Sequence, residues 1–310
     1  MKARAWIALV AVYLVWGSTY LAIRFAIETI PPFVSAGLRF LISGAILFLW
    51  QLLRGEPVPS KVEWRSASII GLLLLLGGNG CLVWAEQRIP SGIASLFIAT
   101  APLWMVLIDA FRPGGTRASW LTWLGVLIGF LGTALLANPW QTHTTGSALD
   151  PVGMAVLIFA ALSWSVGSLY SRKASLPDSP LMGTGMEMLV GSLGLFVLAT
   201  LTGEWGQFHV AQVSLRSIAG LAWLIIFGSG IGFVAYTWLL RNAPTPIVST
   251  YAYVNPMIAI MLGVLVAGER LESLEIISAF IILTGVVLIT TARTLEGRRV
   301  PRVPLLPGED

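Results

Sequence analysis

The chain has 310 residues, of which 56% are hydrophobic and only 11% charged, whereas an ordinary soluble domain carries roughly a quarter charged residues. This composition excludes a soluble globular protein, because a soluble core cannot bury so much apolar surface. The net charge of +4 follows here from the placement of basic loops in a membrane protein, so we expect no nucleic-acid partner.

Ten apolar segments follow one another along the chain, each long enough to cross roughly 30 Å of hydrocarbon as a helix. Only a helix or a closed barrel satisfies its backbone there, and the segments lack the alternation of barrel strands. We therefore predict an all-α integral membrane protein with ten transmembrane helices embedded in the lipid bilayer. The predicted helices fall at about residues 5–27, 33–53, 66–86, 91–111, 119–137, 151–170, 181–202, 216–240, 245–267 and 273–291.

The basic residues predict which side of the membrane each connection faces, because Lys and Arg are retained on the cytoplasmic side. With the N-terminus inside, fourteen basic residues lie on the inner side and four on the outer side, while Arg39 falls within the second helix. Both termini are therefore expected in the cytoplasm. The inner residues are Lys2, Arg4, Arg54, Lys61, Arg65, Arg112, Arg117, Arg172, Lys173, Arg241, Arg293, Arg298, Arg299 and Arg302, and the outer ones are Arg24, Arg88, Arg216 and Arg270.

Neither a cofactor nor a metal is expected. Cys81 is the only cysteine, so one chain can form neither a disulfide framework nor a cysteine-ligated metal site. After the last helix, residues 296–310 contain Pro301, Pro304 and Pro307 among charged residues. This composition is typical of a disordered tail, and we assign it no function.

The chain repeats itself at long offsets. Trp16, Arg24, Pro32 and Gly37 are matched 148 residues later by Trp164, Arg172, Pro180 and Gly185. Farther along each half, Pro90, Ser95 and Pro102 are matched at an offset of 154 by Pro244, Ser249 and Pro256, and Gly132 is matched by Gly285. We therefore predict two five-helix repeats, residues 1–145 and 146–295. Since five is an odd number, the repeats are inverted in the membrane, which is the basis of alternating access around a central site and indicates transport.

Four strings carry a resemblance to a known family: WGSTYLAIR in the first helix, PPFVSAGLRF entering the second, AEQRIPSGIASL between the third and fourth, and YAYVNP with the following GER around the ninth. In this order they resemble the EamA-type branch of the drug/metabolite transporter superfamily over nearly the whole chain. The resemblance implies two inverted halves with a cavity between them, and a bacterial inner-membrane carrier, often an exporter of amino acids or other metabolites. Such proteins commonly have an acidic residue after the fourth helix equivalent to Glu269 after the ninth, but FRPGGTR stands there in this chain.

Two ionisable residues inside the predicted helices are candidates for substrate binding. Arg39 lies about six residues inside the second helix, and Glu187 is its repeat equivalent with the opposite charge. Ionisable groups in a membrane usually face a cavity or a partner. Arg39 would attract an anionic group such as a carboxylate, and Glu187 would bind a cation or a coupling proton. The alternative is that both are paired near opposite membrane surfaces, or extend towards the headgroups.

Aromatic residues mark one face of the first helix. Tyr13, Trp16, Tyr20 and Arg24 recur at helical spacing, which predicts a common face with polar and aromatic character. Trp16 and Tyr20, with Trp164 as the repeat equivalent of Trp16, are candidates to line a substrate cavity. Aromatics beside a terminal arginine can equally be an interfacial anchor.

Pro102 and Pro256 lie near the middles of the fourth and ninth predicted helices, where each removes a backbone hydrogen bond and should kink its helix. A kink can act as a hinge or expose carbonyl groups to a substrate, and Tyr251 and Asn255 would offer polar contacts nearby. A static bend that aids packing is the alternative.

Two polar residues of the third helix are further candidates. Asn79 is flanked by Gly77, Gly78 and Gly80, so it either contacts substrate or belongs to a close helix packing, which the glycines favour. Glu86 ends the third helix and is either an outer gate or a solvated boundary. Asp109 is expected at the inner boundary.

Other function classes fit the sequence less well. A nucleotide-driven pump needs a phosphate-binding loop such as GxxxxGK[ST], which the sequence lacks. An intramembrane enzyme needs a catalytic constellation, but His143 and His209, the only histidines, fall in predicted outer loops without metal-ligand spacing. A passive channel for small solutes is the main alternative. We predict a secondary transporter rather than an enzyme, with a small-molecule substrate such as an amino acid; proton coupling and oligomeric state stay open.

Overall fold

The computed structural model describes residues 3–112, 118–137, 149–243, 248 and 250–299. Five residues used in the sequence analysis, Lys2, Arg117, His143, Pro244 and Ser249, lie outside the described residues, and so does the predicted tail from residue 300. The last helix runs to Arg299, so it extends past residue 296, where the tail was predicted to begin.

The described residues form helices and connections with no strand. In the first half these are α1 (Ala3–Ala26), α2 (Pro32–Leu53), α3 (Lys61–Gly71), η1 (Leu72–Gly80), α4 (Cys81–Ala85), α5 (Ser91–Ile98), α6 (Ala101–Phe111) and α7 (Trp120–Ala137). In the second half they are α8 (Pro151–Ser171), α9 (Pro180–Leu201), α10 (Glu204–Gln207), η2 (Val210–Gln212), α11 (Leu215–Trp223), η3 (Leu224–Ile231), α12 (Gly232–Asn242), α14 (Tyr251–Ala267) and α15 (Ser273–Arg299).

The prediction of an all-α membrane protein with about ten transmembrane helices is confirmed. Within the described part of the chain, nine helical segments are long and apolar enough to cross a membrane, and α14 is a shorter apolar helix. About 20 consecutive, mainly apolar residues, between five and six turns, are what a helix needs to span the hydrocarbon. The ninth helix was predicted from residue 245, but α14 begins at Tyr251.

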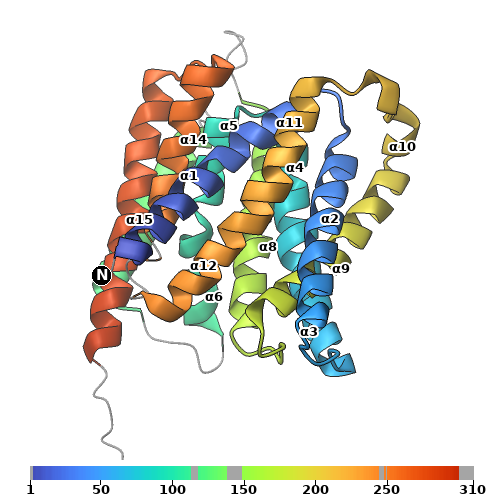
Figure 1. Ribbon diagram of the computed structural model, residues 1–310. Helices are drawn as coiled ribbons and strands as arrows, with labels where there is room; N and C mark the ends of the chain where they lie inside the picture. Colours follow the sequence, from blue (N-terminus) through green and yellow to red (C-terminus); the bar gives the residue numbers. More distant parts are fainter. Residues whose placement is uncertain (1–2, 113–117, 138–148, 244–247, 249, 300–310) are drawn as a thin grey trace, which may run out of the picture.

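The connections of the bundle lie at two opposite ends (Figure 1). We call the end that carries the connections at residues 27–31, 86–90, 202–214 and 268–272 the predicted outer end, and the opposite end the predicted inner end. In Figure 1 the predicted outer end is at the top, near the labels of α5, α10 and α11, and the N-terminus lies towards the bottom.

Helices of one half pack on helices of the other half. In the pairing of α2 with α9, Gly44 and Gly185 meet, and a Cβ on Gly185 would lie 3.2 Å from the Gly44 carbonyl oxygen. Helices α7 and α15 approach equally closely, since a Cβ on Gly285 would lie 2.7 Å from the Gly125 carbonyl oxygen. Such small residues let membrane helices pack backbone to backbone. The two halves therefore form one bundle with close contacts between them.

The third and eighth spans both contain a π-helical segment. Residues 72–80 form η1 between α3 and α4, and residues 224–231 form η3 between α11 and α12. A π-helical segment widens the helix locally and is frequent at functional sites. Near its end each segment has a glycine, a polar residue and a second glycine: Gly78, Asn79 and Gly80 in η1, and Gly228, Ser229 and Gly230 in η3.

The two prolines lie at different places in their helices. The fourth span is interrupted at Ala99 and Thr100, and Pro102 stands in the first turn of α6, where no intrahelical hydrogen bond is lost. The span is thus interrupted directly before Pro102, and a hinge or gate role of this proline stays a prediction. Pro256 lies inside α14, one turn after its start, so it does remove a bond within a helix.

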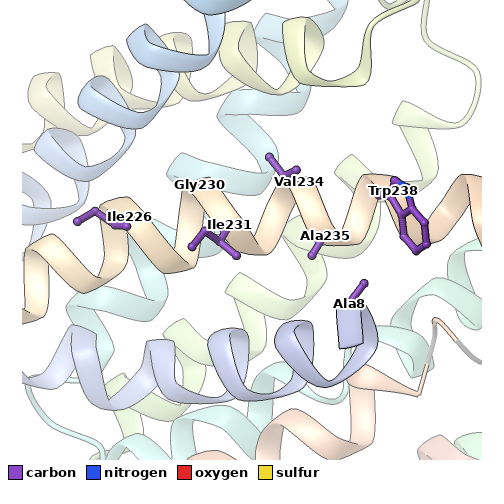
Figure 2. Close-up of a pocket in the computed structure, with 7 residues that line it drawn as sticks. All are labelled: Ala8, Ile226, Gly230, Ile231, Val234, Ala235 and Trp238. Carbon is purple, nitrogen blue, oxygen red and sulfur yellow. The ribbon is translucent and has the colours of Figure 1, made fainter. Parts of the chain in front are cut away.

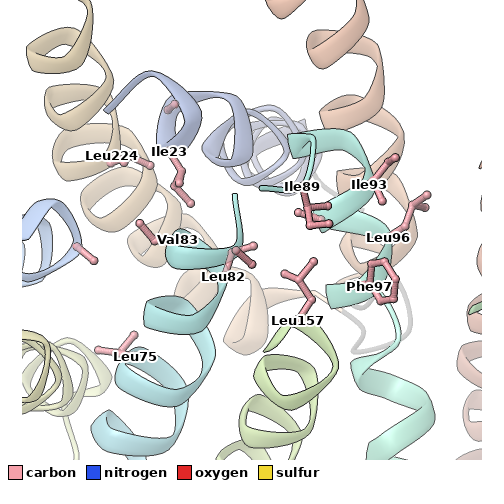
Figure 3. Packing of buried hydrophobic residues seen from close by; sticks show 14 of the residues in the cluster. Ile23, Leu75, Leu82, Val83, Ile89, Ile93, Leu96, Phe97, Leu157 and Leu224 are labelled. Carbon is pink, nitrogen blue, oxygen red and sulfur yellow. The ribbon is translucent and has the colours of Figure 1, made fainter. Parts of the chain in front are cut away.

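A cluster of buried apolar residues holds the helices together near the predicted outer end (Figure 3). It brings Ile23 of α1, Val83 of α4, Ile93 of α5 and Leu224 of η3 together with Leu157 of α8, and each is at most 3% exposed. Burial of a side chain of this size stabilises a fold by about 1.5–3 kcal/mol. This packing surrounds the end of α4, where Glu86 lies.

Candidate functional site

Arg39 is buried in α2 and reaches across to the second half. Its Nε donates a hydrogen bond of 3.0 Å to the Ser229 hydroxyl in η3. The guanidinium also lies 4.8 Å from the ring centre of Phe40. Gly228 leaves room for it, because a Cβ there would lie 3.2 Å from Arg39 Nη2. Arg39 is 6% exposed and makes no ion pair with a described residue, so it neither extends to the headgroups nor is held by a carboxylate.

Trp16 of α1 also packs on η3 and the start of α12. Its Nε1 donates a hydrogen bond of 3.1 Å to the Gly228 carbonyl oxygen. A Cβ on Gly232 would lie 2.4 Å from the same nitrogen, so only glycine fits there. The indole is surrounded by Tyr236 and Tyr251, with ring centres 5.0 and 5.3 Å away. Trp16 is thus part of an aromatic cluster between α1, α12 and α14 rather than an anchor at a membrane boundary.

Trp164 of α8 takes the corresponding place in the other half. A Cβ on Gly78 of η1 would lie 3.1 Å from the indole Cε3 of Trp164. The neighbouring Ser163 donates a hydrogen bond of 2.7 Å to the Leu73 carbonyl oxygen in η1. Trp16 therefore packs on the π-helical segment of the second half, and Trp164 packs on that of the first half. The sequence analysis matched the two tryptophans but did not predict the π-helical segments that they touch.

Neither Asn79 nor Glu187 forms a hydrogen bond with Arg39. The Asn79 amide nitrogen donates to the Leu74 carbonyl oxygen of its own helix at 3.4 Å. Glu187 is half-buried in α9, at a point where a Cβ on Gly71 would lie 2.4 Å from the Glu187 carbonyl oxygen. No hydrogen bond or ion pair to the Glu187 side chain occurs among the described residues. Its role in cation or proton binding stays a prediction.

Asn255 and Tyr20 lie on α14 and α1, which pack together. Asn255 is 7% exposed and its Oδ1 accepts no hydrogen bond from the described residues. Its carbonyl oxygen is close to α1, since a Cβ on Gly17 would lie 3.2 Å from it. Tyr20 is half-buried and interacts electrostatically with Glu86 and Tyr251. Buried acceptors without a hydrogen bond are rare in folded proteins. The Asn255 Oδ1 can therefore accept a hydrogen bond from a bound molecule.

Glu86 is fully buried at the end of α4. Its side chain has no exposed surface, and neither carboxylate oxygen accepts a hydrogen bond from a described residue. The solvated boundary considered in the sequence analysis is therefore wrong, because the Glu86 side chain is fully buried. Arg24 binds the backbone instead, with its Nη1 2.6 Å from the Glu86 carbonyl oxygen. Glu86 interacts electrostatically with Arg24, Arg39 and Glu269.

Two other carboxylates of the second half cap helices of the first half. Glu269, after α14, accepts hydrogen bonds from the backbone and hydroxyl of Ser91, both at 2.7 Å, and from the Gly92 nitrogen at 3.1 Å. Glu204 of α10 accepts hydrogen bonds from the nitrogens of Phe33 and Val34 at 2.9 and 3.0 Å. Burial raises the pKa of Glu204, although these two N–H groups act to lower it. Sequence reasoning missed both caps, since the partners are 170 or more residues apart.

Asp109 lies at the predicted inner end, as expected from the sequence. It forms ion pairs with Arg112 at 2.6 Å and with Arg293 of α15 at 3.3 Å. Its side chain is 3% exposed. The pairing joins α6 to α15, and therefore joins the first half to the second.

An apolar groove of about 410 Å³ lies between α1 and the η3–α12 segment (Figure 2). None of the predicted site residues lines it. Its wall carries Ile226, Ile231 and Val234, which are at least 44% exposed, together with Ala8, Gly230, Ala235 and Trp238. Exposed aliphatic side chains in a transmembrane helix face lipid. The groove is thus part of the lipid-facing surface, outside the cluster of Arg39, Trp16 and Asn255.

The profile of the EamA-like transporter family matches this chain twice, over residues 3–138 and residues 151–291. The chain is 37% identical over 289 residues to a protein of Escherichia coli K12 named "Uncharacterized inner membrane transporter YedA", covering 93% of this chain and 91% of that protein. It is also 25% identical over 310 residues to "Uncharacterized transporter sll0355" of Synechocystis sp., covering 94% of this chain and 92% of the relative.

A solved structure has a similar arrangement of helices. It aligns with a TM-score of 0.63 and 22% sequence identity, covering 94% of this chain and all of the other. Identity at this level shows a shared fold, and a fold hosts many functions. The functional argument therefore depends on the family and on the site residues themselves.

Proposed function

Because the chain belongs to the EamA-like transporter family, and is accordingly a membrane transporter, we propose that it is a secondary carrier that exports an amino acid or a related small metabolite across the bacterial inner membrane. The contact that carries this proposal is the hydrogen bond of Arg39 to Ser229. It places a buried cation of the first half on the π-helical segment of the second half. Both termini would be cytoplasmic, as the distribution of basic residues predicts.

Arg39 is suited to bind the carboxylate of a substrate. In the described conformation its Nε is satisfied by a neutral hydroxyl at 3.0 Å. A carboxylate forms a stronger, charge-assisted and commonly bidentate pair with a guanidinium. A substrate carboxylate would therefore replace or join Ser229 as the partner of Arg39. The neighbouring Gly228 keeps the approach open, since its missing side chain would stand 3.2 Å from Nη2.

The rest of the cluster suits the other parts of an amino acid. Asn255 offers a buried amide oxygen that accepts no hydrogen bond from the described residues, and an ammonium group is a donor that would satisfy it. The rings of Trp16, Tyr236 and Tyr251 offer apolar surface between α1, α12 and α14. A zwitterion with an apolar or aromatic side chain has the matching groups. Glu187, without a described partner, is a second candidate for a cationic group or a proton.

Alternating access is supported by the equivalent packing of the two tryptophans. Trp16 packs on Gly228 of η3 and Gly232 of α12, and Trp164 packs on Gly78 of η1. If the halves are inverted repeats, each tryptophan packs the first helix of one half against the third helix of the other. Loosening one contact while keeping the other would open the central site to one side at a time. Pro256, inside α14, is a candidate hinge.

Counterflow is the experiment that tests the carrier. We would load liposomes containing the purified protein with unlabelled amino acids and measure uptake of labelled ones. A carrier exchanges the two through its alternating site, whereas a passive channel, the competing proposal, gives no transient accumulation. We expect accumulation above empty liposomes.

The Arg39→Ala variant tests the site within the same assay. A hydrogen bond to a charged group contributes about 1.5–3 kcal/mol to binding. Its loss therefore predicts a roughly tenfold to hundredfold higher KM for the labelled substrate. Arg54→Ala is the matched control, because Arg54 directly follows α2 and is exposed over the Trp50 ring. Equal uptake by both variants would show that Arg39 does not bind substrate, while absence of uptake by the unmodified protein would remove the amino acid as substrate.

A further inference from the structure

Glu86 is a buried carboxyl group with no partner for its charge. The side chain is completely buried and neither oxygen accepts a hydrogen bond from the described residues. Burying an ionised carboxylate without a partner is so unfavourable that the group takes up a proton instead. Glu86 directly follows α4, whose residues Leu82 and Val83 belong to the apolar cluster of Figure 3.

The charged neighbours of Glu86 are all bound elsewhere. On α1, Arg24 donates to the Glu86 backbone oxygen at 2.6 Å rather than to the carboxylate, and on α2, Arg39 donates to Ser229. Glu269, which repels a second negative charge, is held by Ser91 and Gly92. Tyr20 is the remaining titratable neighbour.

Other packed elements bring no further charge to Glu86. Helix α8 has no acidic or basic residue between Pro151 and Ser171, and the chain has none between Ser66 and Ala85. Beyond Glu86, Arg88 pairs with Asp150 at the start of α8, with 3.4 Å between Nη1 and Oδ2. Two arginines thus stand near the carboxyl group without binding it.

We propose that Glu86 is a proton-binding site, occupied in the described conformation, and that release of its proton draws Arg24 or Arg39 to the carboxylate. The step is a simple ionisation: the carboxylic acid gives one proton to water and keeps a negative charge. That charge attracts the guanidinium groups on α1 and α2. Because Arg39 is the proposed carboxylate ligand, this inference rests on the proposed function for its link to transport, but not for the proton site itself.

A proton fits this site better than a metal cation. Hard cations need several oxygen ligands at once. Within the part of the chain that the structure describes, no three His, Cys, Asp or Glu side chains gather to hold a metal. A proton needs only the carboxylate.

Infrared spectroscopy tests the proton site without a substrate. In liposomes at neutral pH, the protein is expected to show a protonated-carboxyl stretching band that weakens as the pH rises and that the Glu86→Gln variant lacks. The control is Glu28→Gln, because Glu28 is paired with Arg216 at the surface. A band of equal strength in Glu86→Gln would overturn the proposal. Loss of the band on adding sodium at constant pH would also overturn it, in favour of a metal cation.

Glu86→Asp gives a second result if Glu86→Gln does not fold. Aspartate keeps a carboxyl group in a different position, so the band should persist at a shifted frequency. An unchanged band would show that it arises from another residue.

Transport driven by a pH gradient tests the coupling. A gradient of one pH unit supports up to about a tenfold concentration ratio for each coupled proton. For labelled amino acids we expect this ratio in the unmodified protein and a ratio near one in Glu86→Gln, which should still perform counterflow. Accumulation by Glu86→Gln equal to that of the unmodified protein would overturn the coupling. Absence of counterflow in both would refute the proposed function instead, while the infrared result would still decide the proton site.

Discussion

The two ends of the bundle fasten the halves in different ways. At the predicted outer end, Glu204 and Glu269 of the second half bind backbone N–H groups at the starts of α2 and α5. At the predicted inner end, the starts of α3 and α9 are capped from within their own half, by Ser60 with Glu63 and by Ser179. The described links between halves there run between side chains, as in the pairs of Asp109 with Arg293, Gln51 with Ser179 and Tyr13 with Thr250.

This difference indicates that the predicted outer end is the more firmly closed one. The first N–H groups of a helix have no partner within the helix and carry partial positive charge. A carboxylate from the other half satisfies them with charge-assisted hydrogen bonds, which are roughly twice as strong as neutral ones. Separating the halves at this end would expose both the carboxylates and the helix starts. At the predicted inner end the hydroxyl contacts can be exchanged for water, and of the three pairs named above only that of Asp109 with Arg293 is charge-assisted.

Removal of the Glu269 cap should lower the stability of the protein the most. Glu269→Ala loses three hydrogen bonds at the start of α5, which predicts a loss of about 3 kcal/mol in stability. Thermal unfolding of the protein in detergent would measure it. Glu272→Ala is the matched control, because Glu272 is exposed in the same connection and no hydrogen bond to its carboxylate is described. Similar unfolding temperatures for the two variants would show that the cap does not fasten this end.

Removal of the Glu204 cap should have the next largest effect. Glu204→Ala loses two hydrogen bonds, to the nitrogens of Phe33 and Val34, and we expect a loss of about 2 kcal/mol. The comparison is Glu28→Ala at the same end, which removes a half-exposed ion pair with Arg216 worth less than about 1 kcal/mol. If the ion-pair variant unfolds earlier in the same thermal scan, surface charge rather than capping holds the predicted outer end.

The inner end should respond less to the loss of a cap. Ser179→Ala removes the hydroxyl that accepts from Met182 N at 3.4 Å and binds Gln51. Loss of such a cap typically lowers the free energy of unfolding by about 1 kcal/mol. Ser175→Ala, four residues earlier in the chain and exposed, serves as the control in the same measurement. A loss as large as that of Glu269→Ala would remove the distinction between the two ends.

Sequence reasoning predicted the helices far better than the contacts between them. Hydropathy reports which segments enter a membrane, and ten predicted helices correspond to the spans that the structure describes. The depth of Arg39 was also predictable, because a charge inside an apolar segment is visible in the sequence. Boundaries at Tyr251 and Arg299 were not, since apolar composition does not mark where a helix begins or ends.

The site was predictable only in part, for a physical reason. The partners of Glu204 and Glu269 lie 170 or more residues away, and no local pattern specifies such a contact. The burial of Glu86 was missed because the end of an apolar segment usually meets solvent, whereas the Glu86 side chain has no exposed surface. One signal was available: Gly78-Asn79-Gly80 and Gly228-Ser229-Gly230 repeat the same pattern in the two π-helical segments.

The smallest expected effect is the pH dependence of the Glu204 cap. Burial raises the pKa of Glu204 above its ordinary value, against the opposing effect of the Val34 and Phe33 N–H groups. The folded protein therefore binds this proton more tightly than the unfolded chain does, so the contribution of Glu204 to stability is present at acidic pH and falls as the pH rises through the raised pKa. Glu204→Gln should flatten this dependence in unfolding scans between acidic and neutral pH. A slope of the opposite sign would mean that the two N–H groups outweigh burial, and that the cap at the start of α2 tightens as Glu204 ionises.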